Sequence, residues 1–443
     1  MADLLATLWG GGRAAYVVGG CLRDALLGRE PADWDLTTDA PPERIQELFP
    51  GSLYENRFGT VVVRRAGNQY EITTFRRDVS YSDFRHPDAV EFGESIEEDL
   101  ARRDFTVNAM AWGSRSGNEP GFVDPHGGRN DLARRLLRAV GEPDRRFGED
   151  ALRMVRAVRL AATLGFDVET ETLAAIGRNA ELAEHLSGER IFAELGKLLH
   201  SARPSVGLRL MAELGLLAVV APDLNRQRGV LQNKIAGEDL WDHTLRTVDA
   251  APNRPLVRLA ALLHDIGKPD TLAEGHFHNH ESVGAAMARD YLARLHAPRL
   301  LQERAAHLVR HHMFMYQPNW TDAAVRRFIG KVGPGSIDDL LALREADNEG
   351  SGQSANAGDL TELASRIAGQ LATHLVLTRN DLAIDGNDLM AELGLSQGPL
   401  LGDVLDELTA RVVSEPALND REILLDLSRR LISERRLVEN PDL

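Results

Sequence analysis

Two aspartates stand one residue apart near the amino end of the chain, where Asp33 and Asp35 flank Trp34 in the stretch DWDLTT. The stretch is strand-like, and side chains at i and i+2 of a strand project from the same face. We therefore expect the two carboxylates to lie together. No basic residue separates them, and clustered carboxylate oxygens suit a hard divalent cation such as Mg²⁺. The alternative is a turn or helix-capping use of aspartate, which is the commoner role of this pattern.

The residues around this pair have the chemistry of a phosphate site. Gly19 and Gly20 end the apolar stretch AAYVVGG at a predicted strand-to-helix turn, where glycine lets backbone N–H groups approach an anion. Arg23 lies one turn into the helix, and Glu71 in the strand-like stretch QYEITTF could bring a third carboxylate. Divalent cations held by such a cluster would activate an attacking hydroxyl group and stabilise a leaving pyrophosphate.

The elements that must position these residues fall into two regions. Up to about residue 125, short strands alternate with short helices, and from about Asp131 onward the apolar pattern has a helical period to the end. Strands are expected in AAYVVGG, DWDLTT, GTVVVRR and QYEITTF, the last two as a hairpin turning at AGN. Helices are expected in APPERIQELF and in CLRDALLG, which Gly28 ends. The patterns predict an α+β protein.

The helical region contains two well-marked helices. EDALRMVRAVRLAATLGF places a set of apolar residues on one inner side, namely Leu152, Val155, Val158 and Leu160. LVRLAALLHDIGKPD is predicted to form a second helix, ended by Gly267 and Pro269. The stretch NEGSGQSANAGD has the composition of a loop.

Composition bounds the class of protein. A chain of 443 residues is too long for one core and is expected to form several domains. Its 43% hydrophobic and 27% charged residues are typical of a soluble globular protein. No apolar run approaches the roughly 20 residues that span a bilayer, and the amino end has no charged segment followed by a cleavage site, so we expect no membrane partner. A single cysteine, Cys21, excludes an intrachain disulfide and predicts a reducing, cytoplasmic location.

The net charge is −16, which would disfavour a nucleic-acid partner if the charge were evenly spread. It is not, because arginines crowd residues 102–159. A local basic face on an acidic protein can still hold phosphates.

Several stretches resemble successive motifs of the class II tRNA nucleotidyltransferase and bacterial poly(A) polymerase family. In chain order they are VVGGCLRDALLGREPADWDLTT, EEDLARRDFTVNAMAW, FVDPHGGRNDLARRLLRAV, EDALRMVRAVRLAA and ERIFAELGKLL. LAIDGNDLMAELGLSQGPLLG also resembles the tail of bacterial CCA-adding enzymes. The resemblance implies a polymerase-β-like nucleotidyltransferase head with a mixed sheet, then a mainly helical neck, body and HD domain. The expected boundaries are 1–135, 136–230, 231–350 and 351–443.

The resemblance also implies roles for residues of the head. The aspartate pair would be the Mg²⁺ ligands, with Glu71 as the third carboxylate. Arg103 would contact the triphosphate of CTP or ATP, with Asn108 as a supporting contact. Taken alone, Arg103 and Asp104 would instead form a surface ion pair, worth at most ~1 kcal/mol.

The stretch EDALR could select a base without a template. Asp150 and Arg153 are three residues apart, which places them on one face if the stretch is helical. The carboxylate accepts and the guanidinium donates hydrogen bonds, which matches the amino group and ring nitrogen that cytosine and adenine both present. In the family these positions read the base. Arg156 and Arg159 follow at the same spacing and could reach the triphosphate or RNA backbone. The alternative is an amphipathic helix with a solvated arginine face.

A second constellation lies in DHTLRTV, LLHDIGKPD and ALREADNEG. It comprises His243, His264, Asp265 and Asp347. Imidazole and carboxylate ligands in this order resemble the HD superfamily of metal-dependent phosphohydrolases, and they suit one divalent ion such as Ni²⁺, Mn²⁺, Zn²⁺ or Mg²⁺. His280 and either His311 or His312 could extend the site to a second metal.

The sequence therefore predicts a template-independent nucleotidyltransferase that adds C and A from CTP and ATP to tRNA 3′ ends. Addition of A alone, of CC alone, or of a poly(A) tail stays open. The stretch RRDVSYSDFRHPDAVEF is as long as the loop of full CCA-adding enzymes, which disfavours CC addition alone. Hypotheses of another class are an HD phosphohydrolase with an inactive nucleotide-binding head and a non-catalytic RNA-binding module. The oligomeric state is unknown at this point.

Overall fold

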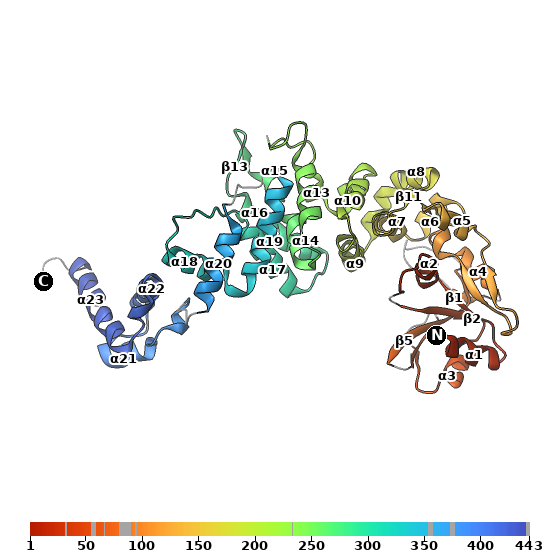
Figure 1. The fold of residues 1–443 in the computed structure, drawn as a ribbon, viewed down its shortest axis with the longest axis horizontal. Coiled ribbons are helices and arrows are strands. Elements are labelled where there is room, and N and C mark those ends of the chain that lie inside the picture. The colour runs from red at the N-terminus through yellow and green to blue at the C-terminus, as the bar shows by residue number, and fades with distance from the viewer. Residues whose placement is uncertain are drawn as a thin grey trace. The chain divides into compact units, whose positions relative to one another are not determined.

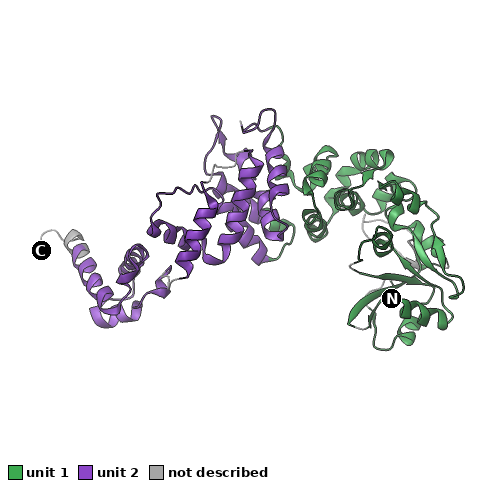
Figure 2. Cartoon of the chain, in the orientation of Figure 1, with its two compact units in different colours: residues 1–229, 291–298 green, residues 230–290, 299–443 purple. Residues whose placement is uncertain are grey.

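The computed structural model describes residues 1–31, 33–54, 59–65, 67–78, 90–93, 95–232, 234–352, 358–372 and 377–439. These residues form two compact units. Unit 1 comprises residues 1–229 and 291–298, and unit 2 comprises residues 230–290 and 299–443 (Figure 2). Within the described ranges, none of the helices combines the length and the apolar character that crossing a membrane requires.

Unit 1 begins with a mixed sheet of seven strands in the order β3-β4-β5-β2-β1-β8-β9. The strands are β1 Ala15–Val18, β2 Asp35–Thr38, β3 Leu53–Tyr54, β4 Thr60–Arg65, β5 Asn68–Thr74, β8 Ala111–Ser114 and β9 Gly121–Val123. Strands β2 and β5 run parallel, whereas β1 is antiparallel to both β2 and β8. The predicted hairpin is confirmed, since Arg65 of β4 pairs with Asn68 of β5. Runs of β-branched residues such as Val61–Val63 are buried and favour the strands.

Short helices surround this sheet. They are α1 Ala2–Gly10, α2 Gly20–Leu26, α3 Pro42–Leu48, α4 Ile96–Ala101 and the 3₁₀ turn η1 Thr106–Asn108, with a small hairpin of β6 Arg76–Asp78 and β7 Val90–Phe92. Helix α4 is capped by Ser95, whose side chain accepts a hydrogen bond from the backbone N–H of Glu98. Tyr16, Phe75 and Leu100 belong to one buried cluster that joins the sheet to this helix. Residues 79–89 of the predicted polar loop lie outside the described residues.

The rest of unit 1 is mainly helical. It contains α5 Gly128–Ala133, α6 Pro143–Glu149, α7 Leu152–Leu164, α8 Thr170–Asn179, η2 Ala180–His185, α9 Gly188–Leu199, α10 Pro204–Glu213, α11 Leu216–Val220 and α12 Pro222–Asn225. The predicted inner side of α7 is confirmed, because its four apolar residues are all buried. Two short strands that the helical pattern did not predict, β10 Leu136–Leu137 and β11 Asp167–Val168, pair in parallel.

Unit 2 is helical apart from a small hairpin of β12 Leu272–Ala273 and β13 His276–Phe277. Its helices are α13 Leu240–Ala250, α14 Pro255–Leu263, α15 Lys268–Thr271, most of α16 His280–Arg294, α17 Arg299–His311, α18 Asp322–Val332, α19 Ile337–Gly350, α20 Leu360–Leu371, α21 Gly386–Leu393, α22 Pro399–Ser414 and α23 Arg421–Glu439, with 3₁₀ turns η3 Pro334–Ser336, η4 Arg379–Asp381 and η5 Pro416–Leu418. Helix α14 packs against α13, α17 and α19 (Figure 1). The mixed-sheet head followed by helices confirms the predicted fold class.

Two predicted elements differ from the structure. The helix that contains LVRLAALL ends at Leu263, so His264 and Asp265 lie in the turn before α15 rather than on the helix. The stretch EDALR is not one helix either. Asp150 has an extended backbone, with φ −148° and ψ 104°, and separates α6 from α7. Asp150 and Arg153 therefore do not share a continuous helical face.

Candidate functional site

Asp35 is the first residue of β2 and lies between two strands. Its Cα pairs with that of Val18 in β1 and with that of Glu71 in β5. Residues paired across neighbouring strands project from the same face of the sheet, so the Asp35 and Glu71 side chains share a face. Asp35 is half-buried and Glu71 is exposed. The parallel β2–β5 pairing thus brings together two of the three predicted carboxylates.

Asp33 does not lie on the strand, which corrects the i, i+2 argument. Strand β2 begins at Asp35 because β1, its antiparallel partner, ends at Val18, where Gly19 starts the turn into α2. Asp33 is exposed in a bend before the strand. It is still close enough to influence Asp35. Burial raises the pKa of Asp35, Arg103 opposes that shift, and the charge of Asp33 adds to it.

The turn after β1 brings a cation and a carboxylate together over glycine. Gly19 has a φ of +79°, which favours glycine. A Cβ at this position would lie 2.9 Å from Arg103 Nη1 and 3.6 Å from Asp35 Oδ2. A Cβ at Gly20 would lie 3.4 Å from Arg23 Nη2. Both glycines therefore leave room for a guanidinium group, and at Gly19 this group lies beside the candidate metal ligand Asp35.

Arg103 is held by Asp99, not by Asp104. Its Nη2 lies 3.2 Å from Asp99 Oδ2, and Arg102 Nη2 lies 2.7 Å from Asp99 Oδ1. Burial would raise the pKa of Asp99, but the two arginines outweigh it and lower the pKa. The alternative of a surface Arg103–Asp104 ion pair is wrong. The buried Nε of Arg103 has no hydrogen-bond partner in the described part of the chain.

A buried polar chain starts at the glycine turn and runs into the helices. Arg23 Nη1 donates to Asn108 Oδ1 at 2.6 Å, and Asn108 Nδ2 donates to Asp104 Oδ1 at 3.1 Å. Arg156 on α7 donates to Asp104 Oδ2 from Nε at 2.9 Å and from Nη2 at 2.7 Å. The predicted residues Arg23, Asn108 and Arg156 are thus connected through Asp104, which sequence reasoning had treated only as a surface residue.

The chain continues through Glu194 on α9. Arg159 Nε donates to Glu194 Oε2 at 2.5 Å, and Arg156 Nη1 lies 3.8 Å from Glu194 Oε1. Glu194 is buried, and the two arginines balance its charge. It belongs to the motif ERIFAELGKLL, in which the sequence argument had singled out no residue. Arg156 and Arg159 of α7 are therefore both engaged in ion pairs within unit 1.

Asp150 and Arg153 each have another partner. Asp150 Oδ2 accepts a hydrogen bond from Arg190 Nη2 at 2.8 Å, and its Oδ1 accepts one from the N–H of Leu152 at 3.1 Å. Arg153 Nη1 donates to Glu149 Oε2 at 2.8 Å. Arg190, at the start of α9, is a candidate that sequence reasoning missed. Its Nη1 is buried without a hydrogen-bond partner in the described structure.

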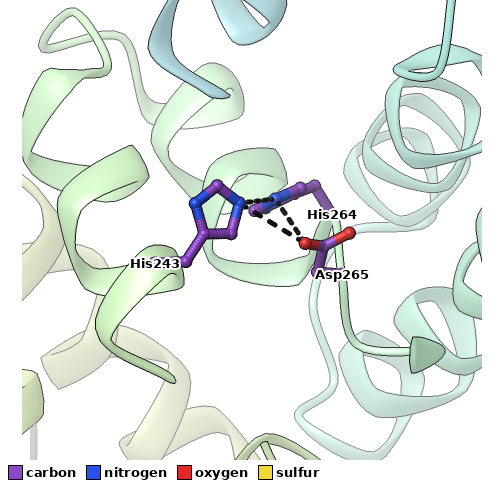
Figure 3. Close-up of side chains that lie close together, drawn as sticks. All are labelled: His243, His264 and Asp265. Carbon is purple, nitrogen blue, oxygen red and sulfur yellow. Dashed lines mark hydrogen bonds and ion pairs between the residues drawn. The ribbon is translucent and has the colours of Figure 1, made fainter. Parts of the chain in front are cut away.

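The second constellation forms one buried cluster in unit 2. His243 Nε2 lies 3.1 Å from His264 Nε2 and 3.4 Å from Asp265 Oδ2, and His264 Nε2 lies 3.1 Å from the same oxygen. Figure 3 shows the three side chains directed toward one another. These ligand atoms lie within 4.8 Å of one another, a spacing that could hold a metal ion. Asp347 Oδ1, on α19, is 3.1 Å from His243 Nε2.

A second group shares Asp265. Its Oδ1 lies 3.4 Å from His280 Nε2 and 3.7 Å from His312 Nε2, and these three residues could also hold an ion. All three of these atoms are buried without a hydrogen-bond partner in the described residues. The structure therefore brings His312 to the cluster and not His311, whose ring lies 4.6 Å from that of His307.

The protonation states of His264, Asp265 and Asp347 suit metal ligation. Burial would lower the pKa of His243, but its hydrogen bonds to Asp265 and Asp347 outweigh burial and raise the pKa. Burial lowers the pKa of His264 to about 4, which keeps the imidazole neutral at neutral pH. Burial would raise the pKa of Asp265, but His264 and Lys268 outweigh it and hold the pKa well below its usual range. Burial would also raise the pKa of Asp347, but the hydrogen bond from His243 outweighs it and keeps this carboxyl ionised.

Three cations stand around these carboxylates. Lys268 Nζ is 2.6 Å from Asp265 Oδ2, Arg344 Nη1 is 2.6 Å from Asp347 Oδ2, and Lys234 Nζ is 3.6 Å from Asp347 Oδ1. They line a cavity of about 270 Å³ together with the two aspartates and His280. A cavity with cations next to candidate metal ligands is suited to an anion such as a phosphate.

Family models match three parts of the chain. The poly A polymerase head domain matches residues 15–138, the probable RNA- and SrmB-binding site of polymerase A matches residues 165–228, and the HD domain matches residues 234–349.

Relatives match nearly the whole chain. The CCA-adding enzyme of Geobacillus stearothermophilus is 33% identical over 414 residues, covering 93% of this chain and 91% of the relative. That of Streptococcus agalactiae serotype V is 31% identical, covering 96% and 94%. The structure of the Bacillus stearothermophilus CCA-adding enzyme in complex with CTP has a TM-score of 0.75 at 31% identity, over 98% of this chain and 97% of that one. At this identity and coverage, with a nucleotidyltransferase sheet and an HD cluster both in place, the chain belongs to the family of CCA-adding enzymes.

Proposed function

We propose that this protein adds C, C and A to the 3′ end of tRNA, using CTP and ATP and no nucleic-acid template. Its relatives are CCA-adding enzymes, and one solved relative is described in complex with CTP. A single observation carries the proposal for the head. Asp35 and Glu71 are paired in register on neighbouring strands, beside the Gly19 turn and the guanidinium of Arg103. Such an enzyme would work on tRNA in the cytoplasm.

Asp33, Asp35 and Glu71 would hold Mg²⁺ in the head. Burial disfavours the charged form of Asp35, and the nearby Asp33 disfavours it further. Arg103 offsets this cost only in part, and a bound cation would stabilise the ionised carboxylate further. Carboxylate oxygens are the ligands that Mg²⁺ prefers. When bound, Mg²⁺ supplies activation of the attacking ribose hydroxyl and stabilisation of charge on the phosphates.

The chain's own residues would bind and orient the triphosphate. Arg103 lies over Gly19 and has an unpartnered Nε, so its guanidinium is placed to donate to phosphate oxygens. Arg23 and Asn108 bind one another at 2.6 Å beneath the same turn and would support it. Arg156 and Arg159, held by Asp104 and Glu194, would supply positive charge without moving, because their ion pairs fix them.

Asp150 and Arg153 would read the base. An incoming cytosine or adenine would offer an amino donor to Asp150 and a ring-nitrogen acceptor to Arg153. In the present geometry Arg190 donates to Asp150 and Glu149 accepts from Arg153. The amino group of the base would take the place of Arg190 as donor, and its ring nitrogen the place of Glu149 as acceptor. Uracil and guanine present the opposite pattern. Each buried mismatch costs roughly 1–3 kcal/mol, enough to discriminate between nucleotides.

The HD cluster supports a second activity, the hydrolysis of phosphate esters. His243, His264, Asp265 and Asp347 would hold a divalent ion, for which Ni²⁺, Mn²⁺, Zn²⁺ and Mg²⁺ are the candidates. His280 and His312 would complete a second position with Asp265. The observation that favours this activity is the cavity of about 270 Å³, in which Lys234, Lys268 and Arg344 stand beside the ligands. The ammonium and guanidinium groups would bind the phosphate, and the buried ligand set would fix the ion.

The head activity is tested with labelled CTP and ATP on three tRNA transcripts, which end at the discriminator base, after the first C and after the second C. We expect full CCA addition to the first transcript and completion of the other two. An Asp35→Ala variant that keeps the wild-type melting temperature is expected to extend none of them. Normal extension by that variant would refute the mechanism, and product length separates CCA addition from A-only, CC-only and poly(A) addition.

A further inference from the structure

A groove of about 580 Å³ lies on the surface of unit 2, and none of its lining residues is a candidate metal ligand. Helices α16 and α17 form its walls, and Val332 and Ser336 close one side. Its lining includes small residues on both helices, Ala285, Ala286 and Ala306. All the lining residues belong to unit 2. Neither the nucleotidyltransferase mechanism nor the HD cluster uses this groove.

The groove is basic on an acidic protein. Arg289, Arg304, His307 and Arg310 line it, against one acidic residue, Glu303. The chain as a whole carries a net charge of −16. Arg289 and Arg310 are exposed, and within the described ranges neither side chain makes a hydrogen bond or ion pair. Two guanidinium groups with their donors free, in a concave surface, form a site for an anion with several charges.

The spacing of the cations fits a polyanion. Arg304 and Arg310 are six residues apart on α17, which corresponds to about 9 Å along the helix axis. One strand of a nucleic-acid duplex carries a phosphate for each ~3.4 Å of its axis. Arg304 Nη2 also lies 3.1 Å from Asp339 Oδ2, which holds its guanidinium in place. Together with Arg310 it would contact phosphates two or three nucleotides apart. His307 donates to the backbone oxygen of Val332 at 2.6 Å, so its ring is fixed between them.

We propose that the α16–α17 groove binds the phosphate backbone of a double-helical arm of tRNA. Its lining residues include no Phe, Tyr or Trp, and the ring of His307 already packs against His311 and is bonded to Val332, so the groove offers no free ring on which the bases of a single strand would stack. Duplex RNA is instead recognised through its shape and its phosphates. The inference rests on the proposed tRNA substrate and adds to it a contact surface far along the chain from the catalytic head.

The test is the salt dependence of tRNA binding by the full-length protein, measured by fluorescence anisotropy with a labelled transcript that ends at the discriminator base. Removing one cation that contacts a phosphate lowers the slope of log K against log salt by about one. We expect the double variant R289A/R310A to lower the slope by about two and to weaken binding at least ~10-fold at 0.1 M salt. R289K/R310K should retain most of the affinity, since lysine still contacts phosphate as a point charge.

The matched control is R299A. Arg299 is exposed on the same helix but lies outside the groove, so its replacement should leave the slope unchanged. If R289A/R310A binds tRNA like R299A while the wild type extends tRNA normally, the groove proposal is overturned and the proposed function stands. If the variant weakens binding of single-stranded poly(U) more than of tRNA, the duplex assignment is wrong. If the wild type neither binds nor extends tRNA, the proposed function fails, and this inference fails with it.

Discussion

Asp104 and Arg156 form a two-bonded ion pair, with N–O distances of 2.9 and 2.7 Å, that joins the segment before η1 to helix α7. Asp104 is also bonded by Asn108, and Arg156 also faces Glu194. The pair therefore connects residues beneath the glycine turn with the helix that follows the proposed base-reading residue Asp150. Such a connection keeps the phosphate-binding and base-reading parts of the proposed site in a fixed relation.

Removal of Arg156 should destabilise the protein more than removal of Asp104. R156A leaves the buried carboxylate of Asp104 with Asn108 as its remaining side-chain partner, whereas D104A leaves Arg156 near Glu194 and one-third exposed. We expect R156A to cost about 3 kcal/mol, the lower end of the range for a broken buried pair. The unit 1 unfolding transition should fall by several degrees, and less in D104A. Calorimetry of both variants checks the order, and a larger cost for D104A would contradict this account.

The cost of R156A should also depend on pH. In the wild type, burial would raise the pKa of Asp104, but Arg156 and Asn108 outweigh it and hold the pKa below its ordinary value of 3.8. Its charge therefore contributes stability above about pH 4 that is lost as pH falls. Without Arg156, burial dominates and raises the pKa of Asp104. Protonation of Asp104 at low pH then removes the unpaired buried charge and reduces the destabilisation of the R156A variant. The difference in Tm between wild type and R156A should shrink from about pH 7 to about pH 4. In D104N/R156A, which lacks the carboxylate, no such relief at low pH is expected.

Replacement of Glu71 tests the third carboxylate. Since Glu71 shares a sheet face with Asp35, we expect Glu71→Gln to remove a metal ligand and to lower the rate of CTP incorporation at least ~100-fold, equivalent to several kcal/mol. The matched control is Glu43→Gln, an exposed residue on α3. Single-turnover incorporation with both variants is the measurement. Equal rates in the two variants would remove Glu71 from the mechanism.

Asp150→Ala should relax nucleotide selection. Loss of one acceptor removes roughly 1–3 kcal/mol of discrimination, so the preference for CTP over UTP should fall about 5- to 150-fold in kcat/KM. Asp144→Ala is the control, because Asp144 lies on the neighbouring helix α6 and forms an exposed pair with Arg178. A variant that rejects UTP as strongly as the wild type would show that Asp150 does not read the base.

Two adjacent histidines give the sharpest test of the HD cluster. His312 lies against Asp265, whereas His311 lies against His307. We expect His312→Ala to bind the second ion at least ~10-fold more weakly and to lose phosphate-ester hydrolysis. His311→Ala should retain both metal binding and hydrolysis. Metal content after dialysis against Ni²⁺ or Mn²⁺ and hydrolysis of a nitrophenyl phosphate ester are the readouts. Equal behaviour of the two variants would contradict the assignment.

The sequence predicted elements whose signals lie within one segment. The glycine turn before α2, the β4–β5 hairpin and the buried side of α7 each follow from a local pattern, and each is confirmed. The position of Asp33 depends instead on where β1 ends, because the β1–β2 ladder stops at the pair Val18–Asp35. The break at Asp150 likewise reflects an extended backbone within a stretch whose residues all suit a helix.

Partners from distant segments were the least predictable. Which of His311 and His312 faces Asp265 depends on the rotation of α17 in the fold, and the sequence offered both. Arg190 was missed because its partner Asp150 is 40 residues away. Lys268 was within reach, since it follows Asp265 by three residues in HDIGK and binds it. Lys234 and Arg344 come from separate segments, and no spacing rule connects them.

The carboxylate of Asp265 serves two neighbourhoods, with Oδ2 toward His243 and His264 and Oδ1 toward His280 and His312. Electron density drawn toward one oxygen is no longer available at the other. If an ion binds on each side, occupancy of one position is expected to change the affinity of the other, and by thermodynamic reciprocity the reverse holds by the same factor. Ion uptake by this cluster should follow a curve for two linked steps rather than for two independent ones.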